Sequence, residues 1–247
     1  MADLIAAIKS YNTILALSLI PTSDIGYIDN EGDTALIWAC CSSLSGIALA
    51  LIATGQTTPS HVNKYGETAL IWACRNTMPD VAMTLIATGQ SKPEQVDVLG
   101  YTALIWACNI NMIDVVRALI ATGNSKPEQI GNYGETALCC ACCENIPDVA
   151  MALIATGQSL PGHICNGDTA LIWACRNDIP VVAMALIATG QSNPEHISDL
   201  GDTALSLATE HNMTDVIAVL ENYDDYIAKL HTVNQYDDPN YVMTIEI

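Results

Sequence analysis

A seven-residue motif, Thr-Ala-Leu-Ile-Trp-Ala-Cys, recurs along the chain and constrains the fold more than any other feature of the sequence. Four unaltered copies begin at Thr34, Thr68, Thr102 and Thr169, and two altered copies begin at Thr136 and Thr203. Each copy starts two residues after a glycine, and the steps between these glycines are 34, 34, 34, 33 and 34 residues. A fixed period of this length predicts a stack of similar units in which each unit packs mainly on its neighbours.

The first half of one unit is represented by residues 63–74. Residues 63–67 are mainly polar and contain Gly66, which predicts a tight turn because glycine tolerates positive φ angles. Thr68 follows as a candidate N-cap whose hydroxyl can accept from an unpaired backbone N–H. Residues 69–74 then form a short apolar helix.

The second half of the unit begins after the short connection at residues 75–78. Pro79 suits the first position of a helix, and Asp80 suits the positive end of the helix dipole. Apolar residues between Val81 and Ile86 recur at helical spacing. Gly89 is the expected left-handed residue that ends this helix. Each unit is therefore predicted to contain a turn, a helix, a loop and a second helix.

This arrangement resembles the ankyrin repeat family. The family pattern has a turn glycine, the motif T-P-L-H-x-A, a second helix with paired valine and leucine, and a closing glycine. The matching residues of one unit are Gly66, Thr68, Leu70, Ala73, Val81, Leu85 and Gly89. Ala69 replaces the proline of the pattern and Ile71 replaces its histidine, which predicts that the turn-to-helix hydrogen bonds usually made by that histidine are absent. The resemblance implies an all-α, ankyrin-repeat solenoid of helix-turn-helix units with short turn fingers.

The same reasoning divides the chain into three parts. Residues 1–28 are expected to form an N-terminal capping helix pair, residues 29–222 six ankyrin repeats of about 34 residues, and residues 223–247 an acidic, tyrosine-containing C-terminal tail. An acidic, solvated tail favours disorder, yet residues 241–247 are rich in strand-forming side chains and follow a turn signal. Two roles stay open for this tail: a cap on the last repeat, or a link between subunits.

The charge of the chain limits the kind of partner it can bind. There are 27 acidic and 8 basic residues, which gives a net charge of −19. Such a charge argues against nucleic acid and against anionic membrane surfaces, because both need Lys and Arg. The charge can be interpreted in two ways: it keeps the protein soluble, or it also attracts a basic protein partner. The sequence contains no apolar run of transmembrane length.

Ten cysteines lie mostly inside apolar runs at equivalent repeat positions. A disulfide framework would place them in loops, so we predict a reducing, cytoplasmic location. Equivalent helices stack about 8–10 Å apart, which is too far for disulfides between equivalent cysteines. Cys139 and Cys143 share one helix face and Cys165 lies on the next turn, so a minor metal or redox site is weighed against a drifted repeat with extra thiols.

No catalytic arrangement is visible. The sequence has no nucleophile elbow, phosphate-binding loop or metalloprotease motif, so we predict neither an enzyme nor a cofactor. The four tryptophans Trp38, Trp72, Trp106 and Trp173 occupy one repeat position, and their placement between successive helices favours a role in the core.

The family resemblance implies binding of another protein through the turn tips and the concave face of the first helices, as an adaptor or scaffold. The alternative is a structural subunit that assembles with itself. Val98, Leu99, Tyr101 and Ile110 stand out as an apolar cluster in the third repeat. The predicted protein-binding residues are Lys64, Tyr65, Arg75, Val98, Leu99, Tyr101, Asn109, Ile110, Tyr133 and Arg176.

Overall fold

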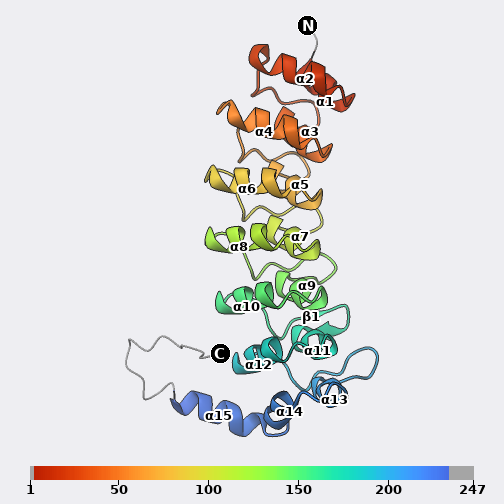
Figure 1. Cartoon of the computed structure of the whole chain (residues 1–247), viewed down its shortest axis with the longest axis vertical. Coiled ribbons are helices and arrows are strands. Elements are labelled where there is room, and N and C mark those ends of the chain that lie inside the picture. Colours follow the sequence, from red (N-terminus) through yellow and green to blue (C-terminus); the bar gives the residue numbers. More distant parts are fainter. Residues whose placement is uncertain (1–2, 234–247) are drawn as a thin grey trace. The chain divides into compact units, whose positions relative to one another are not determined.

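The computed structural model describes residues 3–233, and it separates into two compact units on either side of the Leu160–Pro161 bond. Both units consist of paired short helices joined by turns (Figure 1). Within the described residues the only strands are two strands of two residues each, which form one hairpin, so the predicted all-α solenoid of helix-turn-helix units is confirmed.

The first unit begins with α1 (Leu4–Lys9), α2 (Thr13–Leu19) and the 3-10 turn η1 (Ile20–Thr22). Four helix pairs follow: α3 (Ala35–Cys41) with α4 (Ser45–Ala53), α5 (Ala69–Arg75) with α6 (Pro79–Ala87), α7 (Ala103–Asn109) with α8 (Ile113–Ala121), and α9 (Ala137–Cys143) with α10 (Pro147–Ala155). The first helices of the pairs contact one another in sequence order, and so do the second helices. The unit is therefore a double column of helices (Figure 1).

The second unit starts with an antiparallel hairpin of β1 (Ile164–Cys165) and β2 (Asp168–Thr169). It continues with α11 (Ala170–Arg176), α12 (Pro180–Ala188), α13 (Ala204–Glu210), α14 (Thr214–Leu220) and α15 (Tyr223–Val233). The hairpin coincides with the shortened 33-residue step in the sequence.

Helix α15 corrects the expectation of disorder for the first part of the tail. It packs on α14, and Tyr226, Ile227 and Leu230 are half-buried along one side of it. The acidic residues Asp224 and Asp225 lie in its first turn, where they favour helix formation. The strand-forming residues 241–247 lie outside the described part of the chain.

Threonine caps set the start of every first helix, as the sequence predicts. The Thr68 hydroxyl oxygen accepts from the N–H of Ile71 at 3.2 Å, and the equivalent threonines cap the other first helices in the same way. Pro79 occupies the start of α6, and Gly66 and Gly89 have φ angles of +76° and +67°. The turn glycine, the threonine cap, the helix-starting proline and the closing glycine predicted for one repeat are thus confirmed, and α5 extends one residue beyond its predicted end, to Arg75.

Most residues of the first helices α3, α5, α7, α9 and α11 are buried, whereas α13 is more exposed. In α5, Leu70, Ile71, Ala73 and Cys74 are at most 1% exposed. Burial raises the pKa of the Cys74 thiol to about 12, and burial likewise raises the pKa of Cys175 to about 12. These cysteines are therefore protonated packing residues, in agreement with their predicted role.

Two glycines test how closely successive turns pack. A β-carbon on Gly66 would lie 2.7 Å from the carbonyl oxygen of Val96, whereas one on Gly89 would meet nothing within 4 Å. Both glycines have positive φ, so alanine strains the backbone equally at each. We expect Gly66→Ala to lower the free energy of unfolding by about 1 kcal/mol or more beyond the loss in Gly89→Ala, measured by urea denaturation. Equal losses would show that successive turns are not in close contact.

Candidate protein-binding surface

The turns of the first unit, which we call fingers, comprise residues 29–33, 63–67, 97–101 and 131–135. In each finger the backbone N–H of the first residue donates to the carbonyl oxygen of the fifth. In the second finger, Oδ1 of Asn63 also accepts from the N–H groups of Tyr65 and Glu67, both at 2.9 Å. Asp29 and Asp97 make the same pair of bonds in their fingers. A polar side chain at the first position therefore fixes the shape of these three fingers.

The tryptophans connect the fingers to the first helices. The indole Nε1 of Trp38 donates to Oδ2 of Asp29 at 2.9 Å, and Trp106 donates to Oδ2 of Asp97 at the same distance. Trp72 donates to Oε2 of Glu67 at 3.1 Å. This geometry corrects one prediction, because the tryptophans are half-buried rather than part of the core. In these repeats, which have isoleucine in place of the histidine of the family pattern, the indole makes a hydrogen bond between the turn and the helix.

Basic side chains cover the indole rings. Nζ of Lys9 lies 4.1 Å from the ring centre of Trp38, and Cζ of Arg75 lies 4.8 Å from Trp72 and 5.1 Å from Trp106. These distances fit cation–π contacts. Arg75 also faces Oε1 of Glu67 at 3.5 Å. The side chains beside the fingers are thus tryptophan and arginine, the types that most often dominate protein interfaces.

Neighbouring fingers are held together. Nζ of Lys64 donates to the carbonyl oxygen of Asn30. Asn132 donates through Nδ2 to the carbonyl oxygen of Val98 at 2.9 Å and through its backbone N–H to that of Leu99 at 2.8 Å. The tips of the first and second fingers, and those of the third and fourth, are therefore fixed relative to each other.

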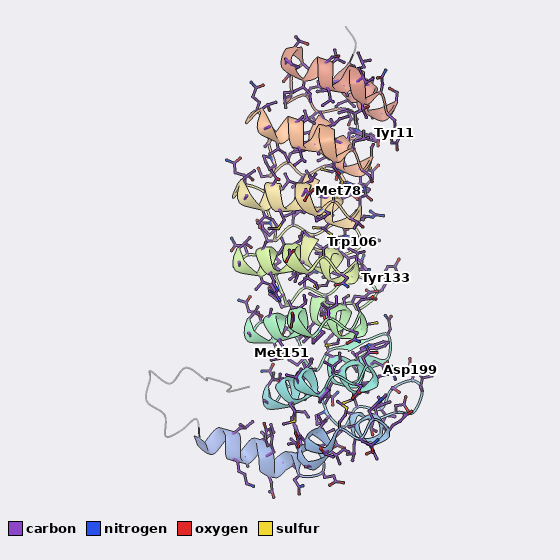
Figure 2. All side chains as sticks on the ribbon, viewed as in Figure 1. Tyr11, Met78, Trp106, Tyr133, Met151 and Asp199 are labelled. Atoms are coloured by element: carbon purple, nitrogen blue, oxygen red, sulfur yellow. The ribbon has the colours of Figure 1, made fainter. Side chains whose placement is uncertain are left out.

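The predicted binding residues differ in their access to solvent. Tyr65, Val98 and Tyr133 are 48%, 59% and 67% exposed on the finger tips, and Tyr133 projects from the finger side of the unit (Figure 2). Lys64 and Asn109 are also exposed, whereas Arg75, Leu99 and Ile110 are half-buried. Arg176 lies in the second unit and pairs there with Asp168 and Asp202.

Tyr101 does not belong to the exposed cluster predicted for the third repeat. It is only 7% exposed, and its ring packs edge-on against Trp106 with the ring centres 5.0 Å apart. A β-carbon on Gly131 would lie 2.0 Å from Cε1 of Tyr101, so the ring fills the space of a missing side chain. The sequence places Tyr101 in a turn, but it does not show that Tyr101 packs over Gly131, which begins the next finger.

Two aspartates of the first finger have opposite electrostatic environments. Burial raises the pKa of Asp33, and the charges of Asp29 and Glu67 add to this effect, although Asn63 donates to Asp33. Burial also opposes the charge of Asp29, but hydrogen bonds from Lys9, the Asp33 backbone and Trp38 prevail and lower its pKa. Ionisation of Asp29 therefore stabilises the fold, and ionisation of Asp33 destabilises it.

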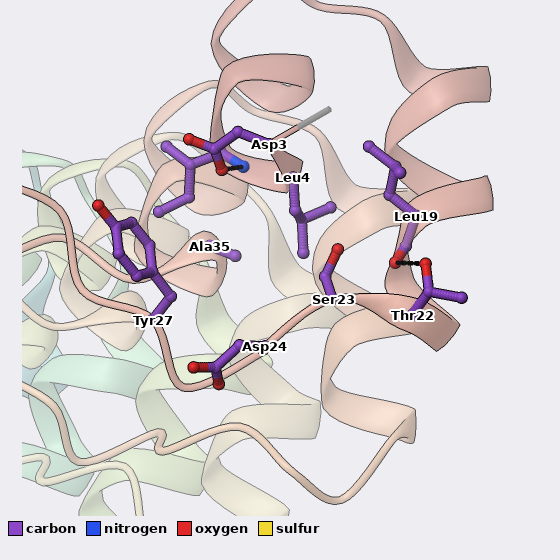
Figure 3. Close-up of a pocket in the computed structure, with 9 residues that line it drawn as sticks. Asp3, Leu4, Leu19, Thr22, Ser23, Asp24, Tyr27 and Ala35 are labelled. Carbon is purple, nitrogen blue, oxygen red and sulfur yellow. Dashed lines mark hydrogen bonds between the residues drawn. The ribbon is translucent and has the colours of Figure 1, made fainter. Parts of the chain in front are cut away.

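A hollow of about 700 Å³ lies beside the N-terminal helices, away from the predicted binding residues (Figure 3). Leu4, Leu19 and Tyr27 are among its lining residues. Its polar groups serve the local fold, since Asp3 caps α1 and the Thr22 hydroxyl donates to the carbonyl oxygen of Leu19. None of the predicted protein-binding residues lines this hollow.

Two further classes of site were tested on residues 3–233. No group of three or more His, Cys, Asp and Glu side chains in this range is placed to hold a metal ion. Cys139 is buried and Cys143 exposed in the first unit, while Cys165 is buried in the second. In the same range, no helix combines the length and the apolar character needed to cross a membrane.

The family profile of ankyrin repeats, described as three copies, matches residues 4–97 and 89–161. The chain therefore belongs to the ankyrin repeat family, whose members generally mediate protein–protein interactions and are typically not catalytic. No curated protein sequence matches the chain.

Among the solved structures that share the fold are the following three. The human ASB11 ankyrin repeat domain is 21% identical with a TM-score of 0.60, over 89% of this chain and 98% of that one. The ankyrin repeat domain of Bcl-3, a member of the IkappaB protein family, is 21% identical with a TM-score of 0.59, over 88% and 98%. A chain from a complex of the Bdellovibrio bacteriovorus endopeptidase Bd0816 with immunity protein Bd3460 is 24% identical with a TM-score of 0.56, over 79% and 99%.

The two aspartates of the first finger give opposite pH predictions. Asp33→Asn should raise the free energy of unfolding at pH 7 by about 1 kcal/mol, because it removes a buried charge. This gain should vanish as the pH falls through the raised pKa of folded Asp33 toward the unfolded value of about 3.9.

Asp29→Asn serves as the matched variant, and it should lower the free energy of unfolding at pH 7 by about 2 kcal/mol. Because the folded pKa of Asp29 is lowered, that loss should persist down to the unfolded pKa of about 3.9 and shrink below it. Urea denaturation between pH 7 and pH 3 measures both effects. Shifts of the same sign would contradict the assignment.

Proposed function

We propose that this protein is a non-catalytic adaptor that binds a partner protein along the edge formed by its finger tips and the adjoining first helices. The observation that carries the proposal is the set of exposed tips Tyr65, Val98 and Tyr133 on fingers that are fixed by internal hydrogen bonds. A pre-formed apolar edge loses little conformational entropy on binding.

The composition of this edge supports a protein ligand. Tyrosine buries a large area with few rotatable bonds, and a half-buried arginine between two indole rings is already ordered before binding. The matched Bdellovibrio structure is a complex between two proteins, which is in keeping with the same use of the fold here.

The buried thiols support a reducing location. Burial raises the pKa of the Cys74 thiol to about 12, and equivalent cysteines recur through the repeats without a disulfide among the described residues. We therefore infer a cytoplasmic protein. The net charge of −19 favours a partner with basic character.

The tips can be tested by removing their side chains. The double variant Tyr65→Ser/Tyr133→Ser should weaken binding of a partner captured with the wild-type chain by about tenfold or more, measured by biolayer interferometry. Met83→Ser is the control, because Met83 is 40% exposed on α6, a second helix. Both proteins should keep the wild-type circular dichroism spectrum. Unchanged affinity of the tip variant would refute the proposed surface.

The charge makes a separate prediction about rates. If the acidic field attracts a basic partner, the association rate should fall about tenfold between roughly 20 mM and 150 mM salt, because screening shortens electrostatic range. The dissociation rate should change much less. Stopped-flow measurements over this range decide, and an association rate that does not depend on salt would leave the charge with a role in solubility only.

Self-assembly is the second candidate, and one feature favours it. Tyr11, Ile14 and Leu17 are 65%, 82% and 46% exposed at the start of the first unit, and residues 10–22 carry no charge. Two acidic molecules could meet at such an uncharged face. Light scattering after size exclusion distinguishes the candidates, since a stable oligomer that Ile14→Asp dissociates would support self-assembly.

A further inference from the structure

The repeats of this chain act as internal comparisons for one finger position. The fifth residue of a finger is acidic in every repeat but the third, and in the second and fifth repeats an arginine of the same repeat reaches it. Oε2 of Glu67 accepts hydrogen bonds from Nε1 of Trp72 at 3.1 Å and from Nδ2 of Asn63 at 3.0 Å. Oε1 of Glu67 forms an ion pair with Arg75 at 3.5 Å. In the second unit Asp168 pairs with Arg176, which also reaches Asp202 at 3.3 Å. In both repeats the arginine is the last residue of the first helix.

The fourth finger breaks this pattern at Glu135. Its Oε2 atom is buried and meets no hydrogen-bond donor among residues 3–233. The repeat has Cys140 at the position of Trp72 and Cys143 at the position of Arg75. Two short side chains therefore replace the indole and the guanidinium that serve Glu67. The third finger has no carboxylate at this position that needs a donor, because its fifth residue is Tyr101.

The environment of Glu135 favours a donor from another molecule. A carboxylate oxygen removed from water without a donor costs free energy, and a charged donor recovers more of this cost than a neutral one. Oε2 itself is enclosed, but the residue as a whole is half-buried, so a turn of its carboxylate would bring this oxygen to an approaching group. The finger is also fixed, because Asn132 bonds to Val98 and Leu99 of the preceding finger.

Glu135 lies inside the proposed binding edge. Tyr133, at the tip of the same finger, is 67% exposed (Figure 2). Glu144, just beyond α9, is exposed as well and adds a negative charge to the fourth repeat. The negative charges of Glu135 and Glu144 therefore favour the approach of a positively charged side chain.

We propose that Glu135 accepts an arginine or lysine side chain of the protein partner, which completes between two molecules the acid–base pair that Arg75 and Arg176 complete within the chain. This inference rests on the proposed function and adds to it a basic anchor residue on the partner, with Glu135 as the residue that selects it.

The geometry can be tested within the protein itself. Cys143→Arg places an arginine where the second and fifth repeats have one, and it should raise the melting temperature by about 2 °C. The gain should disappear in Cys143→Arg/Glu135→Gln, whereas Cys143→Ser alone should show no gain. A gain that survives Glu135→Gln, or no gain at all, would overturn the inference, since position 143 would then not present a cation to Glu135.

The partner chemistry can be tested with a displayed library of random dodecapeptides, selected in parallel on the full-length wild type and on Glu135→Gln. Peptides enriched on the wild type should contain arginine or lysine. Their affinity should fall about tenfold or more for Glu135→Gln and for Cys143→Arg. Glu144→Gln removes an equal charge from the same repeat and should change the affinity by less than about threefold.

The outcomes separate this inference from the proposed function. If the selected sequences do not differ between wild type and Glu135→Gln, the role of Glu135 is refuted. Should those peptides still lose affinity for Tyr65→Ser/Tyr133→Ser, the finger edge stands as the binding surface without a basic anchor. Peptides that bind this tip variant as tightly as the wild type, yet respond to Glu135→Gln, would refute the finger edge and retain the anchor.

Discussion

The hydrogen bond between an indole N–H and a finger carboxylate is the interaction that joins each of the first three fingers to the helix that follows it. Trp38 and Trp106 each reach the first residue of their own finger, and Trp72 reaches the fifth residue of its finger. Each bond adds to the backbone hydrogen bonds of the turn and connects it to a helix that is mostly buried. The same tryptophans offer their ring faces to Lys9 and Arg75, so one residue type fixes the finger and also orders a basic side chain beside it.

The repeats differ in the residues at the tryptophan and arginine positions of the first helix. Where tryptophan and arginine are both present, the finger acid is satisfied within the protein. Where cysteine stands at both positions, as in α9, Glu135 keeps a buried oxygen without a donor. The core is nearly constant along the chain, while the positions that border the fingers change from repeat to repeat. The residues that form the core are therefore different from those that we propose for recognition.

Much of the fold was predictable because it follows from local chemistry. Thr68, Pro79 and Gly89 act through their own backbone geometry, and their roles depend little on distant residues. The burial of Tyr101 was not predictable in this way, since it depends on the missing side chain of Gly131 one repeat later. The tryptophans were assigned to the core because a periodic apolar pattern cannot show that a nearby carboxylate accepts from Nε1. Helix α15 was missed because its acidic residues suggested a solvated tail, although half-buried Ile227 and Leu230 pack it against the last repeat.

The equivalent buried cysteines can serve as probes of local opening, one in each of five repeats. Cys40, Cys74, Cys108 and Cys142 each lie in a different repeat of the first unit, and Cys175 lies in the second; all five are buried. A protonated, enclosed thiol reacts with an alkylating reagent only when its own repeat opens. When a repeat recloses faster than its opened thiol reacts, the labelling rate at each cysteine gives the local opening free energy of that repeat without any mutation. Comparison of these rates would show whether opening spreads from an end of the stack or begins in its interior.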